Sequence, residues 1–182
     1  MPDPDNAALF WGINVGGHRV MKIADLKAVF VELGFAAPRT YLQSGNVVFK
    51  SSAGESPEAA KDRIETAFEE RFGFRSGVVV HGMNAWDRLI AENPYEAEAS
   101  DPTKVHAFLL EGVPSSEAMA LLESFDGSPD RWSRGGGVIY LHTPNGLGRS
   151  RLAERLTRLK VPVTQRNWRT MLALRDMMQP AD

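Results

Sequence analysis

Three short stretches of the chain place glycines, amides and cations where a strand pattern passes into a helix pattern. They are Asn14 to Lys22, Gly148 to Arg151 and Gln165 to Arg169. Backbone N–H groups at a helix start lack intrahelical partners and lie at the positive end of the helix dipole, so such a corner suits a phosphate or a carboxylate. If the fold brings these corners together, we predict a polar ligand site with Gln43 assisting. The predicted ligand-binding residues are Asn14, Gly16, Gly17, Lys22, Gln43, Gly148, Arg149, Ser150, Arg151, Arg166, Asn167 and Arg169.

Each corner also has an ordinary structural interpretation. Gly16-Gly17 makes a tight turn, Lys22 is a solvated lysine in a first helical turn, and Ser150 is a helix cap. The glycine turn also fails both phosphate-loop patterns, because its spacing is not G-x-G-x-x-G and no Gly-Lys-Ser/Thr follows. We therefore expect this turn to line a ligand site only if Arg149 and Arg166 approach it.

The helix expected after Ser150 carries a row of arginines beside its apolar face. The apolar face is Leu152, Leu156 and Leu159, and the ridge beside it is Arg151, Arg155 and Arg158. Like charges at this spacing repel by a few tenths of a kcal/mol per pair, and Glu154 offsets part of that. The ridge is therefore consistent with two interpretations, a solvated surface or a surface that faces an anion.

Known catalytic arrangements are missing from the sequence. Four histidines are scattered, with neither an H-E-x-x-H nor a G-x-S-x-G pattern, and the chain has no cysteine for a thiolate nucleophile or a cysteine zinc site. We predict no metal and no cofactor. Catalytic residues stay unknown, and whether the protein is an enzyme stays open.

Aromatic side chains on one predicted sheet give a second candidate surface. Side chains alternate between the two faces of a strand, so we expect Val105, Ala107 and Leu109 to point toward the helices, together with Ile139 and Leu141. Four other residues of these strands then lie on the opposite face. Those residues are His106, Phe108, Tyr140 and His142. Such a face stacks bases in readers of single-stranded RNA, but the RNA-reader consensus is absent, and burial against the other half of the chain is the alternative interpretation.

The charge of the chain is uneven along its 182 residues. Residues 131–182 hold ten Lys and Arg against three Asp and Glu, a balance of +7, which leaves −9 for the first 130 residues. This pattern suggests an anionic partner for the basic part, docking between the halves, or a solvated face. The acidic start has no signal-peptide pattern, and we expect a cytoplasmic protein with no membrane partner.

Hydrophobic periodicity predicts the order βαββαβ twice, followed by a closing helix. The predicted strands are 7–14, 39–43, 46–50, 78–80, 105–110, around Trp132, 138–142 and 161–164; the predicted helices are 23–33, 57–72, 86–91, 115–125, 149–160 and 168–178. This order predicts an α/β (α+β) fold of duplicated ferredoxin-like units with antiparallel sheets. We expect domains over 1–92 and 104–182, joined by a proline-punctuated acidic linker over 93–103.

An ordered set of motifs runs through nearly the whole chain: Gly12–Gly17, Tyr41–Phe49, Asn93–Tyr95, Gly148–Ser150 and Arg166–Thr170. Together they resemble the bacterial family called domain of unknown function 1697. The resemblance implies a duplicated ferredoxin-like protein without an assigned activity, so no catalytic residue is carried over. The chain has Trp11 where the family leads us to expect arginine, which removes a positive charge near the glycine turn, and Arg151 where lysine is usual.

Three functions are compatible with these observations. The first is a binding module that takes an anionic small molecule or nucleic acid through the basic C-terminal part. The second is an enzyme acting on a small phosphorylated or carboxylated substrate, oriented by Arg149, Arg166 and Arg169 with Asn14 or Gln43 assisting. The third is a protein-interaction module that uses the sheet faces. The sequence leaves the oligomeric state unknown.

Overall fold

The chain folds as two β-α-β-β-α-β units, and the computed structural model describes residues 5–14 and 20–179. Met1–Asp87 and Ala173–Asp182 form the first unit, and Arg88–Leu172 form the second. The changes from one unit to the other fall inside two helices, α3 (Met83–Ala91) and α6 (Trp168–Met178). The expected domain boundaries at 92 and 104 stay a prediction; residues 93–103 lie within the second unit and include the short helix η1 (Ala97–Ser100).

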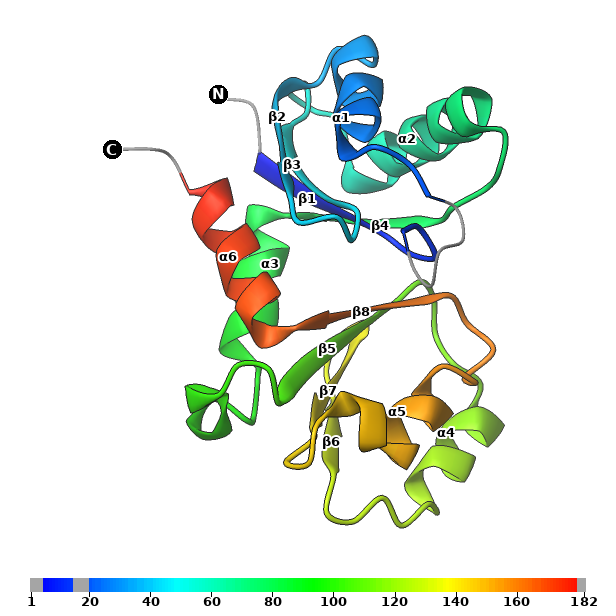
Figure 1. Ribbon diagram of the computed structural model, residues 1–182, viewed down its shortest axis with the longest axis vertical. Helices are drawn as coiled ribbons and strands as arrows, with labels where there is room; N and C mark the ends of the chain where they lie inside the picture. Colours follow the sequence, from blue (N-terminus) through cyan, green and yellow to red (C-terminus); the bar gives the residue numbers. More distant parts are fainter. Residues whose placement is uncertain (1–4, 15–19, 180–182) are drawn as a thin grey trace. The chain divides into compact units, whose positions relative to one another are not determined.

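The first unit is a four-stranded antiparallel sheet with two helices on one face (Figure 1). Its elements are β1 (Asp5–Phe10), α1 (Ile23–Glu32), β2 (Ala36–Tyr41), β3 (Asn46–Lys50), α2 (Pro57–Phe72) and β4 (Val78–Gly82). The strand order is β2-β3-β1-β4. This places the first and third strands side by side at the centre, as the ferredoxin-like order requires.

Local signals set the ends of α2 as expected. The Ser56 hydroxyl accepts a hydrogen bond from the backbone N–H of Ala59, and Pro57 occupies the first helical turn. Gly73 ends the helix in the left-handed conformation at φ 72°. A side-chain cap, a proline with preset φ and a glycine free of Cβ strain are each favourable at those positions. The helix therefore begins and ends where the sequence predicts.

The second unit repeats the same topology. Its elements are β5 (Val105–Leu110), α4 (Ser116–Glu123), β6 (Arg131–Arg134), β7 (Val138–His142), η2 (Leu147–Arg149), α5 (Arg151–Leu156) and β8 (Val163–Asn167), followed by α6. The order β6-β7-β5-β8 matches that of the first sheet, and every pairing is antiparallel. The fold class, a duplicated α+β fold with a C-terminal helix, is therefore confirmed.

Helix α5 is shorter and β8 starts later and ends later than the sequence predicts. The backbone N–H groups of Arg158 and Leu159 donate to carbonyls three residues back, so the α-helix gives way to tighter turns after Leu156. Lys160 then adopts the left-handed conformation at φ 57°. The predicted helix 149–160 thus shrinks to six residues. The predicted corner at 165 is instead the middle of β8.

The predicted distribution of side chains over the second sheet is wrong for β5, where Val105, Ala107 and Leu109 were expected on the helix-covered face and His106 and Phe108 on the other. Phe108 pairs with Ile139 and His106 pairs with Leu141, and directly opposed residues share a face. His106 and Phe108 therefore lie on the face covered by α4 and α5, where Phe108 joins the apolar core of the unit. Tyr140 lies on the other face. The prediction assumed the wrong cross-strand register, so the four rings do not form one stacking surface.

Candidate functional site

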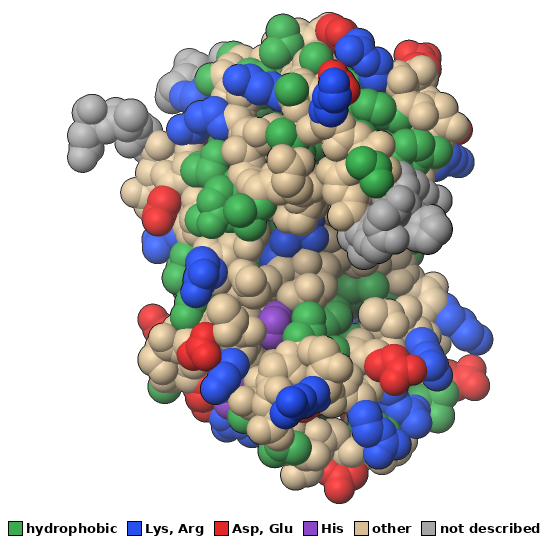
Figure 2. Space-filling model, in the orientation of Figure 1, with side chains coloured by type: hydrophobic (Ala, Val, Ile, Leu, Met, Phe, Trp, Pro, Cys, Tyr) green, Lys and Arg blue, Asp and Glu red, His purple; other side chains and the backbone are tan. Residues whose placement is uncertain are grey.

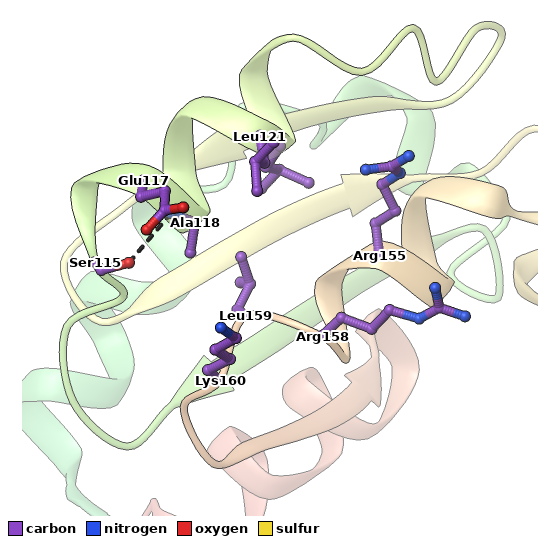
Figure 3. Close-up of a pocket in the computed structure, with 9 residues that line it drawn as sticks. Ser115, Glu117, Ala118, Leu121, Arg155, Arg158, Leu159 and Lys160 are labelled. Atoms are coloured by element: carbon purple, nitrogen blue, oxygen red, sulfur yellow. Dashed lines mark hydrogen bonds between the residues drawn. The ribbon is translucent and has the colours of Figure 1, made fainter.

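A groove between α4 and α5 of the second unit gathers three cations around an apolar floor. We call it the α4–α5 groove; its volume is about 260 Å³. It is lined by Ser115, Glu117, Ala118, Leu121, Leu122, Arg155, Arg158, Leu159 and Lys160. Figure 3 shows the leucines between the helices, with Arg155 extending from α5, Arg158 extending from the turn that follows α5, and Ser115 and Glu117 at the start of α4. The groove therefore combines apolar surface with an excess of positive charge.

The two arginines of the groove are held in different ways. The Arg155 guanidinium lies 4.2 Å from the centre of the Phe125 ring, and that of Arg151 lies 5.4 Å from the same ring. Arg158 donates to the Glu154 carboxylate. Stacking leaves the in-plane N–H groups of a guanidinium available for a bidentate acceptor. Arg155 is therefore the better placed of the two to receive an anion.

Lys160 enters the groove from an unfavourable backbone conformation. A residue with a Cβ pays roughly 1–2 kcal/mol for φ near +57°, and glycine is the residue usually found there. Strained conformations that are retained in a fold often mark positions where the side chain is used. Lys160 is not among the ligand-binding residues that the sequence predicts. The available signal was a lysine that follows the apolar helix face at a position where a glycine stop is usual.

The Gly148–Ser150 corner offers fewer free donors than the sequence suggested. The N–H of Arg149 donates to the Gly146 carbonyl at 3.1 Å, and that of Ser150 donates to the Leu147 carbonyl at 3.0 Å. The Ser150 hydroxyl accepts from the N–H of Ala153 at 2.8 Å and so caps α5. The anion role predicted for Gly148 and Ser150 stays a prediction, with only part of its donors available.

Gly148 and Ser150 line a second hollow, on the β8 side of α5. This β8 hollow has a volume of about 430 Å³ and is lined by Phe108, Leu147, Gly148, Ser150, Ala153, Glu154, Thr157 and Gln165. None of these residues is a lysine or an arginine, and Glu154 is a carboxylate. The β8 hollow therefore lacks the charge that the α4–α5 groove has.

Arg149 and Arg151 line a third hollow, beside the loop that precedes β6. Its other lining residues are Asp126, Gly127, Ser128, Pro129, Asp130 and Asn145. Two aspartates face the two arginines, so the charges balance. The structure thus brings Arg149 and Arg151 together, away from the lining of the β8 hollow.

The predicted site residues of β8 and α6 have structural partners. Arg166 pairs with Ala107 in the sheet, so it points to the face opposite Gln165; it is buried, and this burial lowers the pKa of its guanidinium to about 10. It donates to the Thr164 hydroxyl and the Gln165 carbonyl, each at 2.8 Å. The Asn167 side chain accepts from the N–H of Thr170 at 2.9 Å and so caps α6. Arg169 is exposed on α6.

Of the predicted site residues of the first unit that the structure describes, Asn14 contacts one other, Gln43, through the Gln43 backbone carbonyl. The Asn14 side-chain amide donates to the Gln43 carbonyl at 2.9 Å, and its side-chain oxygen accepts from the N–H of Met21 at 2.8 Å. Asn14 therefore joins the end of β1 to the β2–β3 turn and to the start of α1. Lys22 is exposed at the N-cap position of α1. Gly16 and Gly17 lie outside the described residues.

Trp11, where the resemblance led us to expect arginine, lies directly over Gly77. A Cβ added to Gly77 would come within 1.8 Å of the indole ring. The backbone N–H of Trp11 also donates to the Gly77 carbonyl at 3.3 Å. Here the tryptophan fills space against a backbone that carries no side chain, so it serves packing.

Within residues 5–14 and 20–179, no cluster of three or more His, Cys, Asp or Glu side chains could hold a metal ion. In the same part of the chain, no helix is long and apolar enough to cross a membrane.

Comparison with known proteins agrees with the two-unit architecture. Residues 5–140 match the family model described as "Protein of unknown function (DUF1697)". The chain belongs to this family. The DUF1697 resemblance drawn from the motifs is thereby confirmed, and no activity comes with it. No curated protein sequence is similar enough to serve as a relative.

A solved structure shares the fold of this DUF1697 chain. It is described as that of the conserved bacterial protein SP0830 from Streptococcus pneumoniae, and it superposes with a TM-score of 0.77 at 24% sequence identity. The match covers 97% of this chain and 99% of the other. At this identity the likeness speaks for the fold alone.

Proposed function

We propose that the protein binds a small anion with an apolar part in the α4–α5 groove. The observation that carries the proposal is the lining itself, in which three cations and one carboxylate surround an apolar floor. An apolar floor alone would favour a neutral ligand, and cations alone would favour inorganic anions. Their combination favours a molecule that has a carboxylate or phosphate at one end and a hydrocarbon or ring at the other.

Arg155 supplies the directional contact in this proposal. Its guanidinium rests on Phe125 and pairs with no carboxylate among the described residues. A pre-positioned planar guanidinium loses little side-chain entropy when it donates two hydrogen bonds to an anion. Lys160 adds a point charge from the segment between α5 and β8. The exposed leucine of the floor, Leu121, with 58% of its surface accessible, gains hydrophobic contact when a ligand covers it.

The size of the groove favours a small molecule over a polymer. A volume of about 260 Å³ lies just below the usual range for ligand pockets, which starts at about 300 Å³. Nucleic acid remains the alternative anionic partner, and salt dependence separates the two because a polyanion releases many counterions. We further propose that binding takes place in the cytoplasm, where a chain without cysteines loses no disulfide stabilisation.

Calorimetric titration with three matched probes tests the proposal. Hexyl phosphate carries both parts of the expected ligand, inorganic phosphate only the anion and hexanol only the chain. We expect hexyl phosphate to bind most tightly. The substitution Arg155→Gln should weaken that binding by roughly tenfold, as expected for a lost hydrogen bond to a charged group.

The matched control is Arg134→Gln, an exposed arginine of β6 outside the groove whose substitution makes the same charge change. It should leave binding unchanged. Equal losses in both variants would mean that only general charge matters, and absence of binding by all three probes would disprove the proposal.

A further inference from the structure

A buried histidine behind the β8 hollow orients the side chain that faces it. His106 of β5 is 3% exposed, and both of its ring nitrogens have partners. Its Nε2 lies 3.2 Å from the Thr143 hydroxyl, and its Nδ1 lies 2.8 Å from the side-chain nitrogen of Gln165. The Thr143 hydroxyl in turn lies 3.3 Å from the Lys104 carbonyl. These groups form one hydrogen-bonded chain that ends at the hollow.

The Lys104 carbonyl, at the end of this series of hydrogen bonds, determines which group donates and which accepts in each bond. The Lys104 carbonyl can only accept, so the Thr143 hydroxyl donates to it and accepts from His106 Nε2–H. Burial lowers the pKa of His106 to about 4, with a smaller contribution from His142, so its ring is neutral near pH 7. With Nε2 protonated, Nδ1 is an acceptor, and Gln165 must donate to it through its amide nitrogen. The side-chain oxygen of Gln165, Oε1, is then left without a partner among the described residues, whereas its backbone carbonyl accepts from Arg166.

Other residues that line the β8 hollow also offer hydrogen-bond acceptors, and so favour a ligand that donates hydrogen bonds. Glu154 brings a carboxylate, one oxygen of which accepts from Arg158 and the other of which has no partner among the described residues. The Thr157 hydroxyl already donates to the Glu154 backbone carbonyl at 2.7 Å, which leaves its oxygen free to accept. Phe108, Leu147 and Ala153 supply apolar walls. Acceptors without any lysine or arginine favour a ligand that donates hydrogen bonds and carries positive charge.

We infer that the β8 hollow binds a small primary amine with an apolar body, whose ammonium group donates to the Gln165 side-chain oxygen that the His106 chain holds in place. This site is separate from the α4–α5 groove, because the two hollows share no lining residue. Gln165 and Glu154 contact the ligand, while His106 and Thr143 are positioning residues.

The first experiment measures the tautomer of His106 in the intact protein. Nitrogen-15 NMR of the imidazole should show a protonated Nε2 and an unprotonated Nδ1. Thr143→Val removes the hydroxyl at nearly constant volume and should abolish this preference, whereas Thr143→Ser should keep it. A protonated Nδ1 in the unmodified protein would overturn the inference, because Gln165 would then present N–H donors to the hollow.

The second experiment follows the backbone amide resonances of Gly148, Ser150 and Gln165 during titration with benzylamine and benzoate. Benzylamine should shift these resonances and benzoate should not. Gln165→Met, which removes the polar atoms at similar length, should weaken benzylamine binding by roughly tenfold to a hundredfold. Gln165→Glu, which keeps acceptor oxygens, should retain it.

Lys160→Gly is the control from the other site, and it should leave benzylamine binding unchanged. Binding of benzoate at these resonances, or no shift with benzylamine at millimolar concentration, would overturn the inference. Either result leaves the proposal for the α4–α5 groove untouched, because that proposal depends on different residues and different probes.

Discussion

At the scale of single residues, Lys160 should lower the stability of the fold while it strengthens ligand binding, and one substitution measures both effects. Its left-handed backbone disfavours every residue with a Cβ, so Lys160→Gly should raise the free energy of unfolding by up to about 1 kcal/mol. The same substitution removes a cation from the α4–α5 groove and should weaken hexyl phosphate binding. Denaturant unfolding and calorimetry measure the two effects in one variant.

Leu42→Gly is the matched comparison for this prediction. Leu42 has φ 58°, is exposed and belongs to the first unit. It should gain similar stability with no change in binding. If Lys160→Gly raises the free energy of unfolding but leaves hexyl phosphate binding unchanged, Lys160 has no role in the groove.

His106 should make the stability of the protein depend on pH. Its pKa is about 4 in the folded chain, chiefly because of burial, against 6.5 for an unperturbed histidine. The unfolded chain therefore binds the proton first as the pH falls. The contribution of the neutral His106 ring to the free energy of unfolding is fully present above pH 6.5. It is lost between about pH 6.5 and pH 4, by roughly 3 kcal/mol in total.

Unfolding curves at several pH values measure this loss, with His106→Gln as the comparison, since glutamine does not titrate. The pKa values of His81 and His142 are also lowered by burial, and both are present in either protein, so the difference between the two curves isolates His106. Parallel curves would show that His106 titrates normally and is not shielded in the fold.

At the scale of elements, Asn167 has two possible roles, as the cap of α6 and as a ligand contact, and a substitution distinguishes them. Its side-chain oxygen accepts from the Thr170 N–H at the start of α6. Asn167→Ala should lower the free energy of unfolding by about 1 kcal/mol, and Asn167→Asp, which keeps the acceptor, should lower it little. Thermal denaturation compares the two. Equal stability of the alanine variant would mean that the cap contributes nothing and that a ligand role for Asn167 regains support.

The helix ends show which parts of the fold can be predicted from neighbouring residues in the sequence. The ends of α2 follow from Ser56, Pro57 and Gly73, because caps act through neighbouring backbone groups. The end of α5 could not be predicted in this way, since no glycine marks it and Lys160 takes the left-handed conformation instead. Local chemistry therefore predicts an element well when its stop signals are local.

The candidate site depends on information that the local sequence lacks. Which face of β5 carries His106 depends on the register with β7, and a shift of one residue exchanges the two faces. Gln165 and Arg166, which the sequence had grouped at one corner, lie inside β8, where strand alternation puts them on opposite faces. The arginine ridge on α5 was visible from spacing, but its division between Phe125 and Glu154 depends on what packs beside it.

At the scale of the whole molecule, the charge asymmetry along the chain nearly disappears when the residues are grouped by unit. The first unit holds ten Lys and Arg against thirteen Asp and Glu, and the second holds eleven against ten. Residues 105–130, which include α4, have five acidic residues and no Lys or Arg, and they offset the basic α5 region. Figure 2 shows acidic and basic side chains side by side over α4 and α5. The basic C-terminal third is therefore not a basic surface by itself.

This balance predicts weak binding to nucleic acid. A net charge of +1 on the second unit gives little long-range attraction for a polyanion, so a labelled single-stranded RNA should not bind at about 150 mM salt. Replacing Glu117 and Glu123 of α4 with lysine raises the charge of this unit by four. That variant should bind the RNA at low salt and lose it steeply as salt rises, which fluorescence anisotropy would detect. Tight, salt-sensitive binding by the unmodified protein would instead favour nucleic acid over a small anion as the partner of α5.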